Sequence, residues 1–125
     1  MALSPSIELD TINAPSGGVI GLTPCPGLSG DHSASHPDQR LETDLLSLKD
    51  WGAHYLVTLM ETPELVRHQA GLIHKRAPHH FGPTGWLHLP MPDGGVPGAD
   101  WERQWDRLSG DLHACLARDG RIAIH

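Results

Sequence analysis

Three kinds of side chain in this sequence could carry chemistry: an aspartate in a glycine-rich loop, two cysteines and ten histidines. Asp93 lies in the run Pro92-Asp93-Gly94-Gly95, where a carboxylic acid could give a proton to a leaving group. Cys25 and Cys115 could act as nucleophiles if they ionised to thiolates. His125 follows a short apolar segment. Composition alone favours a plain turn at Asp93, so the surrounding elements must decide.

The cysteines and the scattered histidines are expected to be structural. Cys25 lies between two prolines, and Cys115 falls on the apolar stripe of a predicted helix. Free cysteines are commonly buried as small apolar residues. No His-Glu-x-x-His motif and no cysteine pair at ligand spacing occurs. His32 and His36 lie in a Ser/Pro loop, and His79-His80 are expected to point apart in extended structure. The sequence therefore predicts no metal and no cofactor.

Seven elements are expected to position these residues, four strands alternating with three helices. Hydrophobic periodicity predicts strands at 19–23, 55–59, 86–89 and 121–125, and helices at about 41–51, from 62 to before 71, and from 100 to before 120. Residues 1–18 read as a lead-in segment or an early edge element. This alternation predicts an α/β fold, a mainly parallel sheet with flanking helices.

Capping and glycine signals set the expected helix ends. Thr62 before Pro63 predicts one helix start, Asp100 is expected to cap the longest helix, and Gly52 is expected to end the first. The stretch from His74 to Gly85 is expected to be irregular. In open α/β sheets, ligand chemistry lies beyond the carboxyl ends of the strands, and three of these ends are of interest here, those after Thr23, Leu89 and His125.

Four segments in fixed order resemble the dual-specificity phosphatases of the protein-tyrosine phosphatase family, most closely the kinase-associated phosphatase (cyclin-dependent kinase inhibitor 3-like) branch. They are the early turn Gly21-Leu22-Thr23-Pro24-Cys25-Pro26-Gly27, the helix Asp44–Gly52 leading into the strand Leu56–Leu59, the loop Leu89-Pro90-Met91-Pro92-Asp93-Gly94-Gly95-Val96-Pro97, and the strand Gly120–His125. The resemblance runs from about Val19 to the end of the chain.

The resemblance implies a cysteine-phosphatase fold and hydrolysis of phosphomonoesters through a phosphocysteine intermediate. In this family a His-Cys-x5-Arg segment supplies the nucleophile, and loop amides with the arginine bind the phosphate oxygens. Asp93 corresponds to the general acid that protonates the leaving oxygen. His125 corresponds to the histidine before the nucleophile, which orders the loop through hydrogen bonds. The implied substrate is a phosphoprotein or a small phosphorylated molecule.

The sequence departs from this family at the nucleophile. After Cys25 and five further residues, the position of the family's arginine is occupied by Asp31. Arg121 has this spacing from Cys115, but a predicted helix and turn lie between them. We therefore expect residues 19–125 to be the N-terminal portion of a phosphatase domain, C-terminally incomplete and inactive alone. A frameshift, a split gene with a complementing C-terminal half, and a non-catalytic relic would each account for it.

Two other function classes remain open. One is a non-catalytic interaction module, a pseudophosphatase-like remnant that binds a partner through an uncovered sheet face. The other is a rhodanese-like sulfurtransferase, which the Asp-Gly-Gly loop disfavours because sulfur transfer needs no such acid. A formal net charge of −6 without a basic cluster argues against nucleic-acid binding. No apolar run long enough for a membrane span and no signal peptide occurs, so we expect a cytoplasmic protein.

Overall fold

The chain folds into a five-stranded sheet with helices on both faces. The computed structural model describes residues 7–27, 37–68, 70–91 and 98–125. The strands are β1 (Asp10–Asn13), β2 (Val19–Leu22), β3 (Ala53–Thr58), β4 (Trp86–His88) and β5 (Arg121–Ile124). The helices are α1 (Pro37–Trp51), α2 (Thr62–Arg67), α3 (Ile73–Phe81) and α4 (Ala99–Ala117). The sheet has the order β1-β2-β5-β3-β4, and only β1 is antiparallel to its neighbour.

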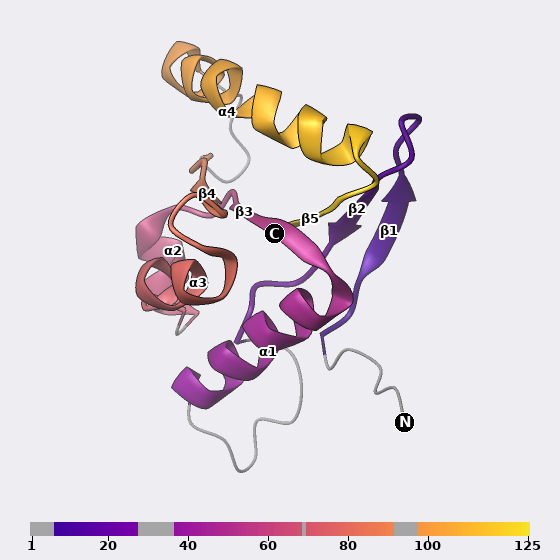
Figure 1. Cartoon of the computed structure of the whole chain (residues 1–125). Coiled ribbons are helices and arrows are strands. Elements are labelled where there is room, and N and C mark those ends of the chain that lie inside the picture. Colours follow the sequence, from indigo (N-terminus) through magenta and orange to yellow (C-terminus); the bar gives the residue numbers. More distant parts are fainter. Residues whose placement is uncertain (1–6, 28–36, 69, 92–97) are drawn as a thin grey trace, which may run out of the picture.

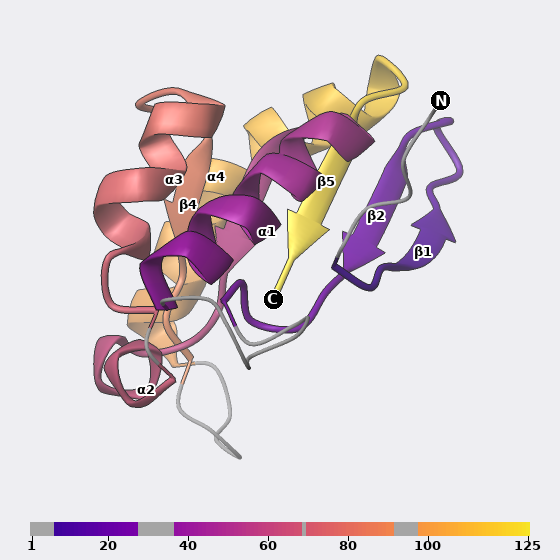
Figure 2. The same cartoon turned by 90° about the horizontal axis from the view of Figure 1, so that it is seen from below.

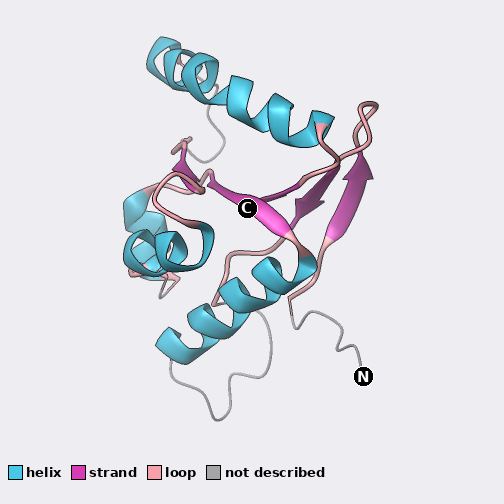
Figure 3. Cartoon of the chain, in the orientation of Figure 1, coloured by secondary structure: helices cyan, strands magenta, loops and turns pink. Residues whose placement is uncertain are grey.

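The sheet separates two layers of helices (Figures 1 and 3). Helix α4 crosses one face, while α1, α2 and α3 lie on the other side. Each layer has its own hydrophobic core, because successive residues of a strand point to opposite faces. The α1 side buries Leu41, Leu45, Leu48, Leu56, Ile73 and Ala123, and the α4 side buries Val57, Leu87, Leu112, Cys115 and Ile122.

Strand β5 occupies the middle of the sheet, between β2 and β3. Its entry from α4 is tight: a Cβ added at Gly120 would lie 2.4 Å from the sulfur and 2.6 Å from the carbonyl oxygen of Cys115. The main-chain N–H of Gly120 donates to that same oxygen at 2.8 Å. Only glycine therefore lets the chain leave α4 and enter the central strand here.

The four expected strands and the three expected helices are present, together with strand β1 and helix α3. Strand β1 pairs with β2 at the sheet edge (Figure 2), so residues 10–13 form the early edge element that the sequence left open as an alternative to a lead-in segment. Helix α3 occupies most of the stretch expected to be irregular, and that prediction was wrong. Its buried residues Ile73 and Ala77 recur at helical spacing, but Pro78 and the polar run before it hid the pattern.

Two predicted caps are also wrong. Glu61, not Thr62, precedes the first turn of α2, and no side-chain cap bond forms there. Helix α4 begins after Gly98, so Asp100 falls inside the first turn and pairs with Arg103. An aspartate in a first turn still favours the helix, because its charge complements the dipole.

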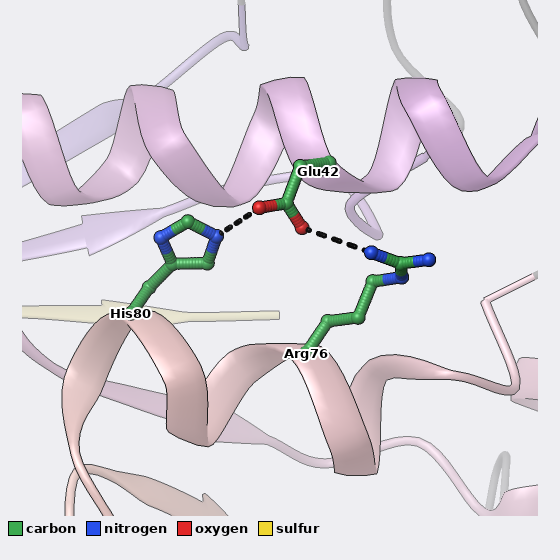
Figure 4. Close-up of polar contacts among 3 residues, drawn as sticks. All are labelled: Glu42, Arg76 and His80. Atoms are coloured by element: carbon green, nitrogen blue, oxygen red, sulfur yellow. Dashed lines mark hydrogen bonds and ion pairs between the residues drawn. The ribbon is translucent and has the colours of Figure 1, made fainter.

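Glu42 ties helix α1 to helix α3 (Figure 4). One carboxylate oxygen lies 2.6 Å from Nε2 of His80, and the other lies 3.6 Å from a guanidinium nitrogen of Arg76. The carboxylate is 40% exposed, so the hydrogen bond with His80 and the ion pair with Arg76 add little to stability and mainly fix how the two helices meet. Within the described residues, no helix is long and apolar enough to cross a membrane.

Candidate active site

The parallel strands β2, β3, β4 and β5 bring their carboxyl ends to one edge of the sheet. Thr58 and His88 are register partners at the ends of β3 and β4, and His125 follows the last residue of β5. Ligand sites in open α/β sheets lie beyond this edge. The structure thus brings one predicted site residue, His125, to the position where the fold favours chemistry.

The main chain of His125 is held by strand β3. Its N–H donates to the carbonyl oxygen of Val57 at 3.0 Å, and its own carbonyl accepts from the N–H of Leu59 at 2.8 Å. On the other side, the N–H of Thr23 donates to the carbonyl oxygen of Ile124 at 3.0 Å. Hydrogen bonds to both neighbouring strands therefore fix the main chain at the end of β5, and with it the position from which the His125 side chain extends.

The side chain of His125 joins a polar cluster on the α1 side of the sheet. Its Nε2 lies 2.7 Å from the hydroxyl oxygen of Thr58, and Nε1 of Trp86 donates to that oxygen at 2.9 Å. The ring of His88 stacks on Trp86 with centroids 5.3 Å apart. Nε2 of His88 donates to the carbonyl oxygen of Met60 at 2.7 Å. Strands β3, β4 and β5 each contribute to this cluster.

Burial keeps His125 neutral. Removal from water, with a smaller contribution from the nearby His88, lowers the pKa of His125 to about 4. The Nδ1 atom is buried and has no hydrogen-bond partner among the described residues. At neutral pH this ring is an uncharged hydrogen-bonding group rather than a cation that could bind an anion.

The other predicted site residue, Asp93, lies outside the described residues. The residues on either side of 92–97 are placed at the same edge of the sheet. The N–H of Met91 donates to the carbonyl oxygen of Leu59 at 2.9 Å. The indole N–H of Trp101, in the first turn of α4, donates to the carbonyl oxygen of Leu89 at 3.1 Å. The role of Asp93 stays a prediction.

Cys25 is buried and protonated. Its sulfur contacts the carbonyl oxygen of Pro26 at 3.6 Å, and the residue is 7% exposed. Burial, followed by the negative charges of Glu64 and Asp44, raises the pKa of Cys25 to about 12. A reactive cysteine needs the opposite, an electropositive and accessible setting. Cys25 is a packing residue of the core on the α1 side.

Cys115 and Arg121 form the one Cys-x5-Arg spacing in the sequence, but they do not form a phosphate site. Cys115 is buried on α4, and burial raises its pKa even though the nearby Arg118 opposes the shift. Arg121 begins β5 at the opposite end from His125. Its guanidinium donates to the carbonyl oxygen of Trp51 at 2.7 Å and stacks over that indole ring.

No group of three or more metal-ligating side chains occurs within the described ranges. His32 and His36 lie outside those ranges. His79 and His80 are consecutive residues of α3, with ring centroids 5.8 Å apart and perpendicular, so the expectation of extended structure there was wrong. His80 instead serves the contact with Glu42.

Sequence reasoning missed Thr58, Trp86 and His88. A usable signal was present, because each predicted strand ends in or carries a polar or amphipathic residue near its carboxyl end. In a parallel sheet such residues meet at one edge. The alternation of Trp86 and His88 on one face of β4 would have pointed the same way.

A search of solved structures matches the chain to a crystal structure of kinase associated phosphatase in which a serine replaces the catalytic-site cysteine. The TM-score is 0.72, the sequence identity is 18%, and the match covers 95% of this chain and 64% of that chain. At this identity the likeness shows the fold, and it confirms the predicted α/β class with a mostly parallel sheet. The sequence matches no protein-family model and no curated protein.

Proposed function

We propose that this chain is the N-terminal portion of a cysteine-dependent phosphatase domain of the protein-tyrosine, dual-specificity type. Asp93 is its general acid, and His125 precedes the nucleophilic cysteine of a His-Cys-x5-Arg segment. The domain hydrolyses a phosphomonoester of a phosphoprotein or of a small phosphorylated molecule through a phosphocysteine intermediate. The 125 residues alone supply no competent nucleophile and are inactive by themselves.

One observation carries this proposal: the main chain of Leu59 forms hydrogen bonds with both His125 and Met91, and Met91 directly precedes the segment that contains Asp93. The N–H of Leu59 donates to the carbonyl of His125 at 2.8 Å, and its carbonyl accepts from Met91 at 2.9 Å. The main chain after β5 and the main chain entering 92–97 are thus neighbours at the ligand-binding edge of the sheet. The likeness to kinase associated phosphatase supports the same assignment.

The chemistry divides between the two halves of such a domain. A thiolate attacks phosphorus, and the leaving oxygen takes a proton from the acid, so that the carboxyl of Asp93 becomes a carboxylate. The same carboxylate can then accept a proton from the water that attacks the phosphocysteine. The buried thiols Cys25 and Cys115 cannot replace the nucleophile, because burial raises the pKa of each.

The test begins with the coding sequence after the codon for His125, read in all three frames. A Cys-x5-Arg segment there, joined to this chain, is expected to release phosphate from p-nitrophenyl phosphate, while the 125-residue chain releases none. In the joined protein, Asp93→Asn is expected to lower kcat by about 10²–10⁴-fold, the size of general acid catalysis. It also removes the limb of the pH profile that reports the acid.

Asp100→Asn is the matched control, since it removes the same charge just beyond the loop from a side chain that is 87% exposed. It is expected to leave kcat unchanged. Absence of a Cys-x5-Arg segment in every frame contradicts the proposal. So does an Asp93→Asn enzyme that retains the full rate and pH profile.

A second candidate, a non-catalytic interaction module, is favoured by one feature. An apolar cavity of about 370 Å³ lies between α4 and the sheet, lined among others by Ile20, Leu59, Trp105, Leu116 and Ile124. An apolar cavity of this size accommodates side chains of a partner. A stable, monomeric and folded 125-residue chain without a downstream nucleophile segment would favour this candidate over the phosphatase.

A further inference from the structure

The hydroxyl group of Thr58 lies between two ring nitrogens that come from other strands. Its oxygen is 2.9 Å from Nε1 of Trp86 and 2.7 Å from Nε2 of His125. Thr58 is fully buried, and its main-chain oxygen already accepts from the N–H of Leu89. The hydroxyl is therefore out of contact with solvent, and these two rings must satisfy it.

The donor and acceptor inventory fixes the direction of both bonds. An indole N–H can only donate, so Trp86 occupies one lone pair of the Thr58 oxygen. The hydroxyl has a single proton, and the described residues offer it one acceptor, Nε2 of His125. If Nε2 carried the proton instead, the hydroxyl proton of Thr58 and the lone pair of Nδ1 would both be buried without a partner. When Nε2 accepts, only the N–H on Nδ1 is unpaired, so this arrangement costs one buried unpaired group less. Thr58 therefore donates to His125.

This direction decides which nitrogen of His125 holds the ring proton. A neutral imidazole has one N–H, and when Nε2 accepts, that N–H lies on Nδ1. Nδ1 is buried and has no partner among the described residues. The ring thus carries a buried donor that the described part of the chain does not use, which is unusual for a folded protein.

We propose that Thr58, oriented by Trp86, is a positioning residue that fixes His125 as the Nδ1–H tautomer and keeps this donor available at the carboxyl edge of the sheet. Its catalytic meaning rests on the proposed function: there the donor would order the main chain that binds the phosphate. Neither Thr58 nor Trp86 touches the substrate in this scheme. The tautomer itself does not depend on any activity of the chain.

The experiment uses the 125-residue chain labelled with ¹⁵N in its histidines. Long-range correlation spectra between ring nitrogens and ring protons at pH 7 identify the protonated nitrogen, and His125→Gln assigns the signal by its loss. We expect the proton of His125 on Nδ1. Thr58→Val keeps the shape and removes the hydroxyl, so the ring is expected to shift toward the Nε2–H form. Thr58→Ser keeps the hydroxyl and is expected to retain the wild-type spectrum.

A wild-type His125 with its proton on Nε2 overturns the inference, and so does a folded Thr58→Val chain with the wild-type tautomer. If circular dichroism shows that Thr58→Val does not fold, Trp86→Phe takes its place. That change removes the N–H that orients the hydroxyl, so a mixture of tautomers is expected, and an unchanged spectrum overturns the inference.

The tautomer and the proposed function can fail separately. An Nδ1–H ring that responds to Thr58→Val, in a chain whose joined form hydrolyses no phosphomonoester, supports the inference and contradicts the phosphatase. An active joined form in which Thr58→Val leaves the tautomer of His125 unchanged supports the phosphatase and overturns the inference.

Discussion

The main-chain N–H of Gly27 donates to Oδ2 of Asp44 at 2.7 Å, and this bond joins the turn after β2 to the middle of helix α1. Asp44 is only 3% exposed. The guanidinium of Arg40 completes the contact by donating to the carbonyl oxygen of Gly27 at 3.1 Å. Gly27 has a φ of 96°, a conformation that favours glycine, so the turn depends on both its residue type and these partners.

Removing this carboxylate is expected to destabilise the fold. Asp44→Ala leaves the buried N–H of Gly27 without its charged acceptor, and such bonds contribute about 1.5–3 kcal/mol. We expect the free energy of unfolding to fall by about 2–3 kcal/mol, measured by urea denaturation followed through tryptophan fluorescence. Asp50→Ala, an exposed carboxylate on the same helix, is expected to change it by less than about 0.5 kcal/mol. Equal effects of the two substitutions would contradict this role for Asp44.

Much of the fold could be predicted because its buried faces are periodic. Leu41, Leu45 and Leu48 predicted α1, and all three are fully buried. Two elements lacked such a signal. Strand β1 is an edge strand whose Ile12 is 52% exposed, so burial imposes no alternation on it. Helix α3 contains Pro78, which breaks most helices but here lies in the second half of a short one.

The candidate site could be predicted only in part. The position of His125 at the end of a strand followed from its apolar segment. Its partner Thr58 could not be predicted, because their contact depends on β5 lying next to β3. The periodicity of a single strand does not determine which strands are neighbours in the sheet. The direction of the hydrogen bond needs a third residue, Trp86, from yet another strand.

The low pKa of His125 is expected to make stability depend on pH. Its pKa falls from 6.5 to about 4 on folding, so between these values the unfolded chain binds a proton that the native chain does not. Stability is therefore lost as pH falls through this window. At 1.36 kcal/mol for each pKa unit, the loss attributable to His125 reaches about 3 kcal/mol near pH 4. Urea denaturation at pH 7, 6, 5 and 4 measures it.

His125→Gln separates this effect from the other titrating groups. Glutamine keeps an oxygen that can accept from Thr58 and has no proton to bind in this range. His88 is the titratable group that acts on His125, and it is present in both proteins. The wild type is expected to lose about 2–3 kcal/mol more than the variant between pH 7 and pH 4. Parallel stability curves would show that His125 does not titrate as described.

Both cysteines are expected to resist alkylation while the chain is folded. Burial raises the pKa of Cys25 to about 12 and also raises that of Cys115, so neither forms a thiolate at pH 8. Iodoacetamide is expected to react at least about 100-fold more slowly with the native chain than with the chain in urea. Mass spectrometry of timed samples measures both rates. Rapid modification of either cysteine near pH 6, as a nucleophilic thiolate would show, contradicts this assignment.

The turn from α4 into β5 is expected to tolerate no side chain at Gly120, whereas α4 itself gains from one at Gly110. In Gly120→Ala the new methyl group would lie 2.4 Å from the sulfur of Cys115 and 2.6 Å from its carbonyl oxygen, so strand β5 must shift. Overpacking of this kind costs about 1–3 kcal/mol.

Gly110 is exposed within α4, and a Cβ there meets nothing within 4 Å. Gly110→Ala is expected to stabilise the chain by about 1 kcal/mol, because alanine is the better helix former. Urea denaturation of both variants measures these opposite signs. A stabilising Gly120→Ala would mean that α4 and β5 do not meet as closely as described.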